Sequence, residues 1–234
     1  MRRTGLQLIL GCLLAALAGI ALKSDARAQG QEVDVALVLA IDCSFSVDAN
    51  EFRLQMEGLG RAFLQPEIKK AIRSGPNGQI AVAAVQWSDE SNQAVIVPWR
   101  IIATDKDADA LGTLLGGMPR KLAEGGTSIS MAIAYSAKLL TEAPPTGRRV
   151  IDISSDGRNN IGPAVNTMRD RIVAQGITIN ALTILNEWPT LDAYFEKYVI
   201  GGQGAFVIPS NDYSAYAEAI YRKLLREITG PGIS

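Results

Sequence analysis

The sequence predicts an α/β fold, namely a doubly wound open sheet that is mostly parallel with one antiparallel edge strand and has helices on both faces. Apolar runs typical of buried strands alternate along the chain with stretches whose apolar residues recur at helical spacing. Two β-rich stretches, 79–87 and 93–99, are separated by a polar turn and predict a hairpin, which supplies the antiparallel edge strand.

The first 28 residues have the features of a secretory signal peptide. Basic residues precede an apolar run over 6–22, and Ala26-Arg27-Ala28 has the small-x-small form that signal peptidase requires. We expect cleavage after Ala28, a single domain over 29–234, and a secreted or periplasmic location. A permanent anchor would want about 20 apolar residues without a processing site, and the apolar run before Cys12 is too short for a lipidation box.

The mature chain begins with a near-continuous apolar run, VDVALVLAI over 33–41, which is typical of a strand buried on both faces. Apolar residues at helical spacing follow over 49–63, and a short helix is predicted over 67–73 after Pro66. The Gly-Pro-Asn-Gly cluster at 75–78 predicts a turn before the hairpin.

The second half of the chain continues the alternation of helices and strands. The predicted elements are, in order, a helix from 105 to about 115, a helix over 128–141, a strand over 149–154, a helix over 163–175 with Pro163 in its first turn, a strand over 177–185, a helix over 191–198, a strand over 205–208 and a closing helix over 213–227.

Composition excludes several functional classes. Without residues 1–28 the chain keeps 19 basic and 23 acidic residues, a net charge of −4, so no basic excess points to nucleic acid. The chain has no histidine, which excludes imidazole as a base, a triad member or a zinc ligand. Cys43 has no intramolecular partner once the leader is removed, and we expect it to be a small buried apolar group.

Oxygen-bearing side chains gather in three loops of the predicted sheet. Asp42-Cys43-Ser44-Phe45-Ser46 follows the first strand, Ser154-Ser155-Asp156-Gly157 follows the strand over 149–154, and Gly125-Gly126-Thr127-Ser128 precedes a helix. Open parallel sheets bind ligands at the carboxyl ends of their strands, where the strand order reverses. Hard oxygen donors without soft ligands favour Mg²⁺, Mn²⁺ or Ca²⁺ over zinc or copper.

Each loop alone also has an ordinary structural explanation. Serine, threonine and aspartate favour helix N-caps, and Asp156-Gly157 alone is a common turn. The three loops together favour a binding site. Trp188 lies in a loop after a strand, where it either packs against the domain or borders the ligand face.

The spacing of these side chains resembles the metal-ion-dependent adhesion site of von Willebrand factor type A (vWA) domains. The resemblance extends over 33–228 and includes the hairpin. The matching positions are Asp42-x-Ser44-x-Ser46, Thr127, and Asp156 in an Asp-Gly-x-x-Asn setting with Gly157 and Asn160. The chain is also similar to a narrower group of secreted bacterial vWA-like proteins, domain of unknown function 1194, through Gln55 and the Ala-Val-Gln-Trp-Ser strand end at 84–88.

The resemblance implies roles for the five matching side chains. Ser44 and Ser46 would bind one divalent cation directly, Thr127 would bind it directly or through water, and Asp42 and Asp156 would hold ordered waters. The cation would be Mg²⁺, or alternatively Mn²⁺ or Ca²⁺. Its open position would take an exposed Asp or Glu of a protein or peptide partner. The rim of the ligand face would be formed by Phe45, Gly126, Gly157 and Trp188.

These expectations favour an exported protein-binding module without enzymatic activity. Two alternatives stay open. The first is a structural subunit of an envelope assembly in which the cation only stabilises the fold. The second is a Mg²⁺-dependent phosphatase of the haloacid-dehalogenase kind, but such enzymes need an acidic residue two positions after the strand-end aspartate, and Ser44 stands there.

Overall fold

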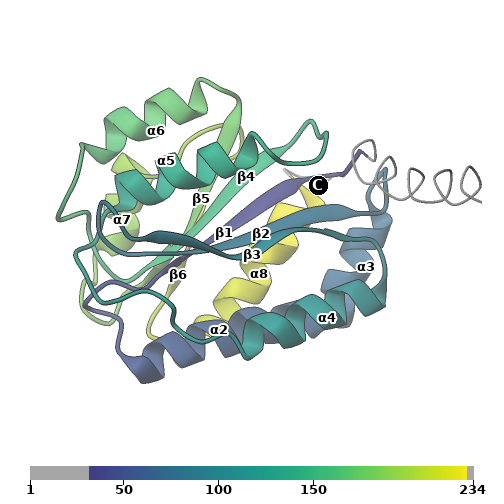
Figure 1. Cartoon of the computed structure of the whole chain (residues 1–234), viewed down its shortest axis with the longest axis horizontal. Helices are drawn as coiled ribbons and strands as arrows, with labels where there is room; N and C mark the ends of the chain where they lie inside the picture. Colours follow the sequence, from purple (N-terminus) through teal and green to yellow (C-terminus); the bar gives the residue numbers. More distant parts are fainter. Residues whose placement is uncertain (1–31, 231–234) are drawn as a thin grey trace, which may run out of the picture. The chain divides into compact units, whose positions relative to one another are not determined.

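A six-stranded sheet runs through the middle of the domain (Figure 1). Its strands are β1 (Ala36–Asp42), β2 (Ile80–Trp87), β3 (Gln93–Ile102), β4 (Arg149–Ser155), β5 (Ile177–Ile184) and β6 (Val207–Ser210). They lie in the order β3-β2-β1-β4-β5-β6, and β3 pairs antiparallel with β2 while the other neighbours pair in parallel. The predicted fold class, including the antiparallel edge strand, is confirmed.

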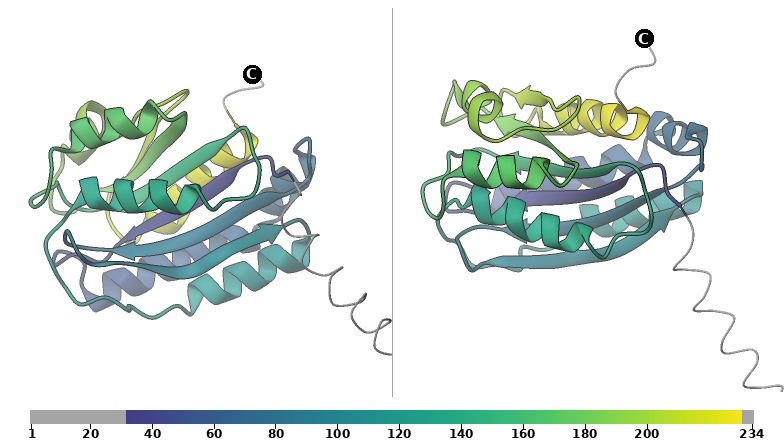
Figure 2. Two further views of the ribbon diagram at one scale, coloured as in Figure 1. Left: turned by 45° about the horizontal axis from the view of Figure 1, so that its top comes forward. Right: turned by 90° about the horizontal axis from the view of Figure 1, so that it is seen from above.

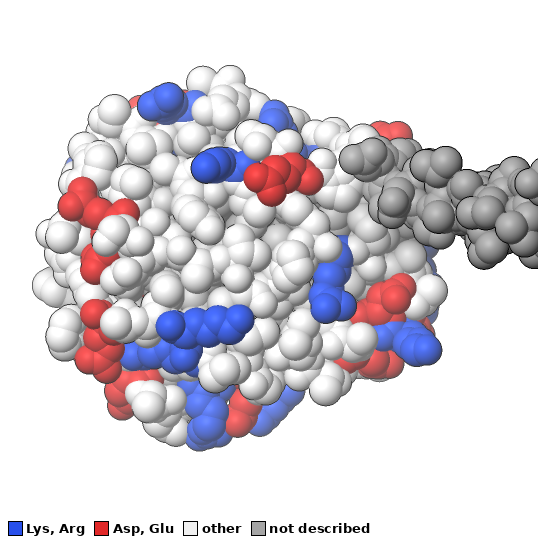
Figure 3. All heavy atoms as spheres, viewed as in Figure 1, with Lys and Arg blue, Asp and Glu red and all other residues white. Residues whose placement is uncertain are grey.

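The computed structural model describes residues 32–230, and those from Val33 onward form one compact unit. The predicted leader over 1–28 and its cleavage point lie outside the described residues, and both stay predictions. Within the described part, no helix is long and apolar enough to cross a membrane. On the face shown in Figure 3, the basic side chains are interspersed with acidic ones rather than forming a continuous tract.

Helices cover both faces of the sheet (Figure 2). One face carries α2 (Ala49–Leu64), α3 (Pro66–Ser74), α4 (Asp105–Gly116) and α8 (Tyr216–Thr229), and the other carries α5 (Ile129–Leu140), α6 (Val165–Val173) and α7 (Leu191–Tyr198). Alternate residues of β1 supply the two cores: Leu37 and Leu39 face the first set of helices, and Val38 faces the second. A central strand that is buried on both faces explains the continuous apolar run of its sequence.

Helix starts follow local side-chain chemistry. Asp48 accepts a hydrogen bond from the backbone N–H of Glu51, whose side chain accepts one from the backbone N–H of Asp48, so α2 begins with a complete capping box. Thr104 and Asp107 form the same arrangement at α4. The capping box at Asp48 therefore ends the loop that follows β1.

Several predicted boundaries were wrong by two or three residues. The first strand begins at Ala36 rather than at 33, and the second strand of the hairpin ends at Ile102 rather than at 99. The helix predicted from Pro163 begins at Val165, because Ala164 is still extended (ψ 125°). The last strand begins at Val207, since the side chain of Asn180 takes the hydrogen bond of the Phe206 N–H. The closing helix begins at Tyr216, preceded by a turn in which the Asp212 carboxylate accepts the Ala215 N–H.

The strand order reverses between β1 and β4, which lie side by side at the centre of the sheet. Chain connections leave in opposite directions on either side of this point, so the carboxyl ends of the two strands border a crevice. Asp42 ends β1, and Asp156 directly follows β4. The fold therefore brings two loops with the expected oxygen donors to one place.

Candidate metal centre

The loop after β1 is organised around the Asp42 carboxylate. The Ser44 N–H donates to Asp42 Oδ1 at 2.7 Å, so the chain turns back immediately after the strand. This turn brings the hydroxyls of Ser44 and Ser46 to 3.3 Å from each other. The Phe45 N–H donates to the Gly125 carbonyl at 2.9 Å, which fastens this loop to the glycine loop before α5.

The second carboxylate, Asp156, is tied to the same loop. Ser46 Oγ donates to Asp156 Oδ1 at 2.6 Å, and Tyr213 Oη donates to Asp156 Oδ2 at 2.9 Å. Asp42 in turn accepts a hydrogen bond from Ser155 Oγ on Oδ2 at 2.5 Å. Hydroxyl donors from three parts of the chain thus hold the two carboxylates in fixed orientations.

Thr127 is held near the two carboxylates by Asn160, which lies in the loop after β4. Asn160 Oδ1 accepts the Thr127 N–H at 2.8 Å, and Asn160 Nδ2 lies 3.4 Å from Thr127 Oγ1. A Cβ placed on Gly157 would lie 3.4 Å from Thr127 Oγ1 and 3.9 Å from Ser46 Oγ, so both hydroxyls border the space above this glycine. The structure therefore brings all five sequence-predicted positions together at one end of the sheet.

The two carboxylates are buried side chains that repel each other. Both Asp42 and Asp156 have 0 % of their surface exposed. Burial, followed by the negative charge of Asp156, raises the pKa of Asp42 to about 7. Burial also raises the pKa of Asp156, against the hydrogen bonds from Ser46 and Tyr213 that lower it. Without a neighbouring cation, the ionised pair is therefore unfavourable.

The residues fit a small divalent cation in two respects. The oxygens of Ser44, Ser46 and Thr127 are neutral, hard donors, and Mg²⁺ accepts such donors while keeping several of its waters. A positive ion beside Asp42 and Asp156 would offset both their burial and their mutual repulsion. Among residues 32–230, no group of three or more cysteine, aspartate or glutamate side chains is placed to hold a metal ion, so hydroxyls make up most of this donor set.

A concavity of about 490 Å³ opens above these side chains. Its lining includes Ser46 and Thr127 together with all four residues predicted for the rim, Phe45, Gly126, Gly157 and Trp188. Phe45 is 74 % exposed and Trp188 is 44 % exposed. Two large apolar side chains therefore stand at the mouth of a pocket that also carries the hydroxyls of Ser46 and Thr127, which is typical of a binding surface.

Arg158 also lines the concavity, and the sequence analysis did not single it out. Its guanidinium lies 5.0 Å from the centre of the Trp188 ring and 5.4 Å from that of Tyr194, and it donates to Thr190 Oγ1 at 3.1 Å. These contacts hold Trp188 on the rim although it is exposed. They also place a positive charge beside the pocket.

Two further residues of the centre were missed. Tyr213 was placed in the closing helix, but it precedes α8 and donates to Asp156 across 57 positions of sequence. Ser155 stood in the quoted loop without a role, yet it donates to Asp42 across 113 positions. Because Ser155 is adjacent to Asp156 in the sequence, its hydroxyl could have been predicted as part of the centre. A single tyrosine near a helix start has no such sequence feature.

The profile of a protein family described as "Protein of unknown function (DUF1194)" matches residues 32–232. The chain belongs to the DUF1194 family. Residues 32–232 include every element of the sheet and the whole candidate centre. No curated protein matches the DUF1194 chain in sequence.

Solved structures share the fold of this DUF1194 protein at low sequence identity. Proximal thread matrix protein 1 from the mussel byssus, in a structure with a zinc-occupied MIDAS motif, is 16 % identical, has a TM-score of 0.58 and covers 86 % of this chain and 49 % of its own. A von Willebrand factor type A protein from Catenulispora acidiphila is 16 % identical, has a TM-score of 0.58 and covers 84 % of this chain and 43 % of its own.

The pilus adhesin SpaC from Lactobacillus rhamnosus GG is 13 % identical, has a TM-score of 0.58 and covers 86 % of this chain and 31 % of its own. This DUF1194 chain thus spans about half, or less, of the length of these three solved structures. The shared architecture makes the DUF1194 domain vWA-like in fold, as the sequence predicted.

Proposed function

We propose that this protein is an exported, divalent-cation-dependent protein-binding module without enzymatic activity. The observation that carries the proposal is the meeting of two buried carboxylates with three hydroxyls at the switch point of a vWA-like sheet. In this proposal Ser44 and Ser46 hold the cation directly, Thr127 directly or through water, and Asp42 and Asp156 through ordered waters. Bound there, the cation would supply the positive charge to which a carboxylate of the partner binds.

The surroundings of the centre favour an anionic partner group. Because α2 and α5 begin immediately after the loops of the centre, their positive N-terminal dipole ends lie at this end of the sheet. Arg158 adds a positive charge on the rim, which the neighbouring lining residue Glu187 balances, so the preference for an anion comes from the helix ends and the proposed cation. The exposed rings of Phe45 and Trp188 suit an apolar side chain next to the acidic one. The proposed partner is therefore a protein segment with an exposed Asp or Glu beside a large apolar residue.

Cation binding is tested by calorimetric titration of the mature chain, residues 29–234, with Mg²⁺ and with Mn²⁺. We expect saturable binding to one site. The Asp42→Ala, Ser44→Ala double variant should not bind, and Thr127→Ala should bind roughly tenfold more weakly or worse, since it loses one charge-assisted contact. Ser91→Ala is the matched control, because this hydroxyl bonds only within the hairpin turn at Asp89.

Circular dichroism of each variant separates lost binding from lost folding. Equal affinity in wild-type and variant proteins, all of them folded, would refute the assigned site. A second titration addresses the partner: the Mg²⁺-loaded protein should bind a capped Gly-Trp-Asp-Gly peptide and not the same peptide with Asn. Equal binding of both peptides would show that a carboxylate is not what the centre recognises.

The alternative of a structural cation in a permanent assembly makes a different prediction. A permanent assembly would bury the rim, and the protein would be recovered from its native envelope as a stable complex in the presence of chelator. The proposed module should instead be released from its partner by chelation. The two results distinguish a cation that binds a partner from one that only stabilises the fold.

A further inference from the structure

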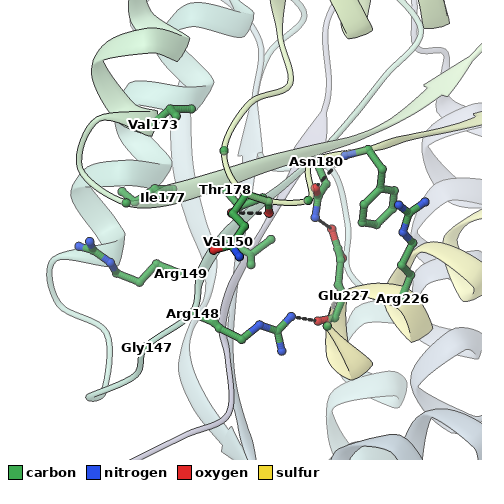
Figure 4. A pocket seen from close by; sticks show the side chains of 16 residues that line it. Gly147, Arg148, Arg149, Val150, Val173, Ile177, Thr178, Asn180, Arg226 and Glu227 are labelled. Carbon is green, nitrogen blue, oxygen red and sulfur yellow. Dashed lines mark hydrogen bonds between the residues drawn. The ribbon is translucent and has the colours of Figure 1, made fainter. Parts of the chain in front are cut away.

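We propose that the protein has a second ligand site, at the opposite end of the sheet, which binds a small solute that carries phosphate or carboxylate groups. The site is a pocket of about 480 Å³ between the amino ends of β4 and β5 and the last turn of α8 (Figure 4). Asp42 and Asp156 lie at the carboxyl ends of their strands, so this pocket is separate from the candidate metal centre. The inference does not depend on the proposed cation.

Three arginines supply most of the charge of this pocket. Arg148 and Arg149 stand at the start of β4, and Arg226 stands in the last turn of α8. Glu227 is the one acidic side chain among the lining residues. Within residues 32–230, none of the three arginines forms a salt bridge with Asp or Glu. The charges of Arg149 and Arg226 are therefore available to a ligand, whereas Arg148 also interacts with the charges of Glu227 and Asp34.

Neutral contacts hold these guanidinium groups in place. Arg148 donates to the backbone carbonyls of Glu227 and Ile228, and so closes the C-terminal end of α8 (Figure 4). Arg149 donates one N–H to the Gln175 carbonyl. The guanidinium of Arg226 stacks 3.9 Å from the centre of the Phe206 ring. A guanidinium has five N–H donors, so each arginine is positioned and still has donors to spare.

The inner wall of the pocket does not oppose an anion. Glu227 is 2 % exposed, and its Oε1 accepts hydrogen bonds from Asn180 at 2.9 Å and from Lys223 at 2.6 Å. Burial, followed by the charge of Asp152, raises the pKa of Glu227 to about 8. The ion pair with Lys223 also offsets the charge of this carboxyl, and the three arginines outnumber it among the lining residues.

The remaining lining suits a small polar molecule. Thr178, Asn180 and Gln203 add hydroxyl and amide groups, and several rim positions are glycines, which carry no side chain to close the mouth. The volume lies within the range of about 300–1,000 Å³ that is typical of small-molecule sites. Planar guanidinium groups pair with phosphate and carboxylate oxygens through two parallel hydrogen bonds. This chemistry favours a phosphate ester or a polycarboxylate over a neutral or cationic solute.

The test uses the full mature chain in metal-free buffer at constant ionic strength, with pyrophosphate, tricarballylate and the cation agmatine as probes. Calorimetry should detect one-site binding of at least one of the two anions. The double variant Arg149→Gln, Arg226→Gln should bind that anion roughly tenfold more weakly or worse. Arg222→Gln is the matched control, because this arginine is on the same helix, outside the pocket, and faces Glu218.

Arg148 is left unchanged in these variants because it holds the end of α8. Tighter binding of pyrophosphate would identify a phosphate ester as the ligand class, and tighter binding of tricarballylate would identify a polycarboxylate; both support the site. Binding of neither anion, an equal loss in Arg222→Gln, or tighter binding of agmatine would overturn the proposal. Anion binding that persists in Asp42→Ala, Ser44→Ala would show that the site is independent of the metal centre.

Discussion

In metal-free buffer, replacing Asp42 by Asn should reduce the pH dependence of folding stability by the part that this carboxyl contributes. Asp42 is fully buried, and burial together with the charge of Asp156 raises its pKa from 3.8 to about 7. Asn has the same shape and can still accept the Ser44 N–H, while Ser155 Oγ can accept from its amide. The substitution therefore removes the ionisable group and keeps most of the local hydrogen bonding.

The sign and size of the effect follow from proton linkage. Below the unfolded pKa of 3.8, both states hold the Asp42 proton and the carboxyl costs no stability. As the pH rises through about 7, the unfolded chain releases the proton first, so the folded state loses stability across this window. One pKa unit corresponds to about 1.4 kcal/mol, so the whole shift costs on the order of 4 kcal/mol and the part above pH 5 about 3 kcal/mol.

Urea denaturation at pH 5 and pH 8 measures the effect. Between these values the unfolding free energy of the wild-type protein should fall by about 3 kcal/mol more than that of Asp42→Asn, because the other buried carboxyls are common to both proteins. Asp170→Asn, a change at a side chain that is 68 % exposed, is the matched control and should behave like wild type. At pH 8, added Mg²⁺ should raise the unfolding free energy of the wild-type protein and leave that of Asp42→Asn unchanged. Equal pH slopes in wild type and Asp42→Asn would refute the reasoning.

Three other substitutions have defined outcomes. Tyr213→Phe removes a buried hydrogen bond to Asp156 and should lower the unfolding free energy by about 1–3 kcal/mol in chemical denaturation. Gly60→Ala should destabilise the protein by about 1–3 kcal/mol or more in thermal melts, because its Cβ would lie 2.5 Å from a backbone oxygen of α4. Its control, Gly147→Ala, should not change stability, since the added Cβ would have no atom within 4 Å. Lys223→Ala leaves two buried acidic side chains without their cation and should cost about 3–5 kcal/mol in urea denaturation.

Elements with strong local patterns could be predicted from the sequence. The helix over 191–198 has the predicted bounds, because its apolar spacing and flanking residues agree. The strand predicted over 33–41, which the structure has at Ala36–Asp42, and the hairpin were found because continuous and alternating apolar patterns differ from helical ones. The loops that carry Asp42 and Asp156 could be located for the same reason, since each follows a strand directly.

Contacts between distant segments could not be predicted in this way. The hydroxyl of Tyr213 reaches Asp156, and the guanidinium of Arg158 reaches Trp188, only after the sheet order has brought their loops together. Helix ends that depend on such contacts were also misplaced, because the turn before α8 competes with continuing the helix. Local periodicity contains no information on which side chain fills which gap.

The pocket at the start of β4 could not be predicted from the sequence either, because its lining comes from distant segments of the chain. Arg148 and Arg149 are adjacent in the chain, but Arg226 comes from the end of α8, far along the sequence. Two neighbouring arginines have no diagnostic pattern. Only the pairing of β4 with β5 and the packing of α8 against the sheet bring the three charges to one pocket.

The central claim is that Ser44, Ser46 and Thr127 hold a divalent cation between them and the carboxylates of Asp42 and Asp156. Crystals of the mature chain grown with Mn²⁺ test it most directly, through the anomalous scattering of the metal. The account predicts one strong anomalous peak in contact with the hydroxyls of Ser44 and Ser46. Saturating Mn²⁺ with no peak at this place, or with the metal bound elsewhere on the domain, would contradict it.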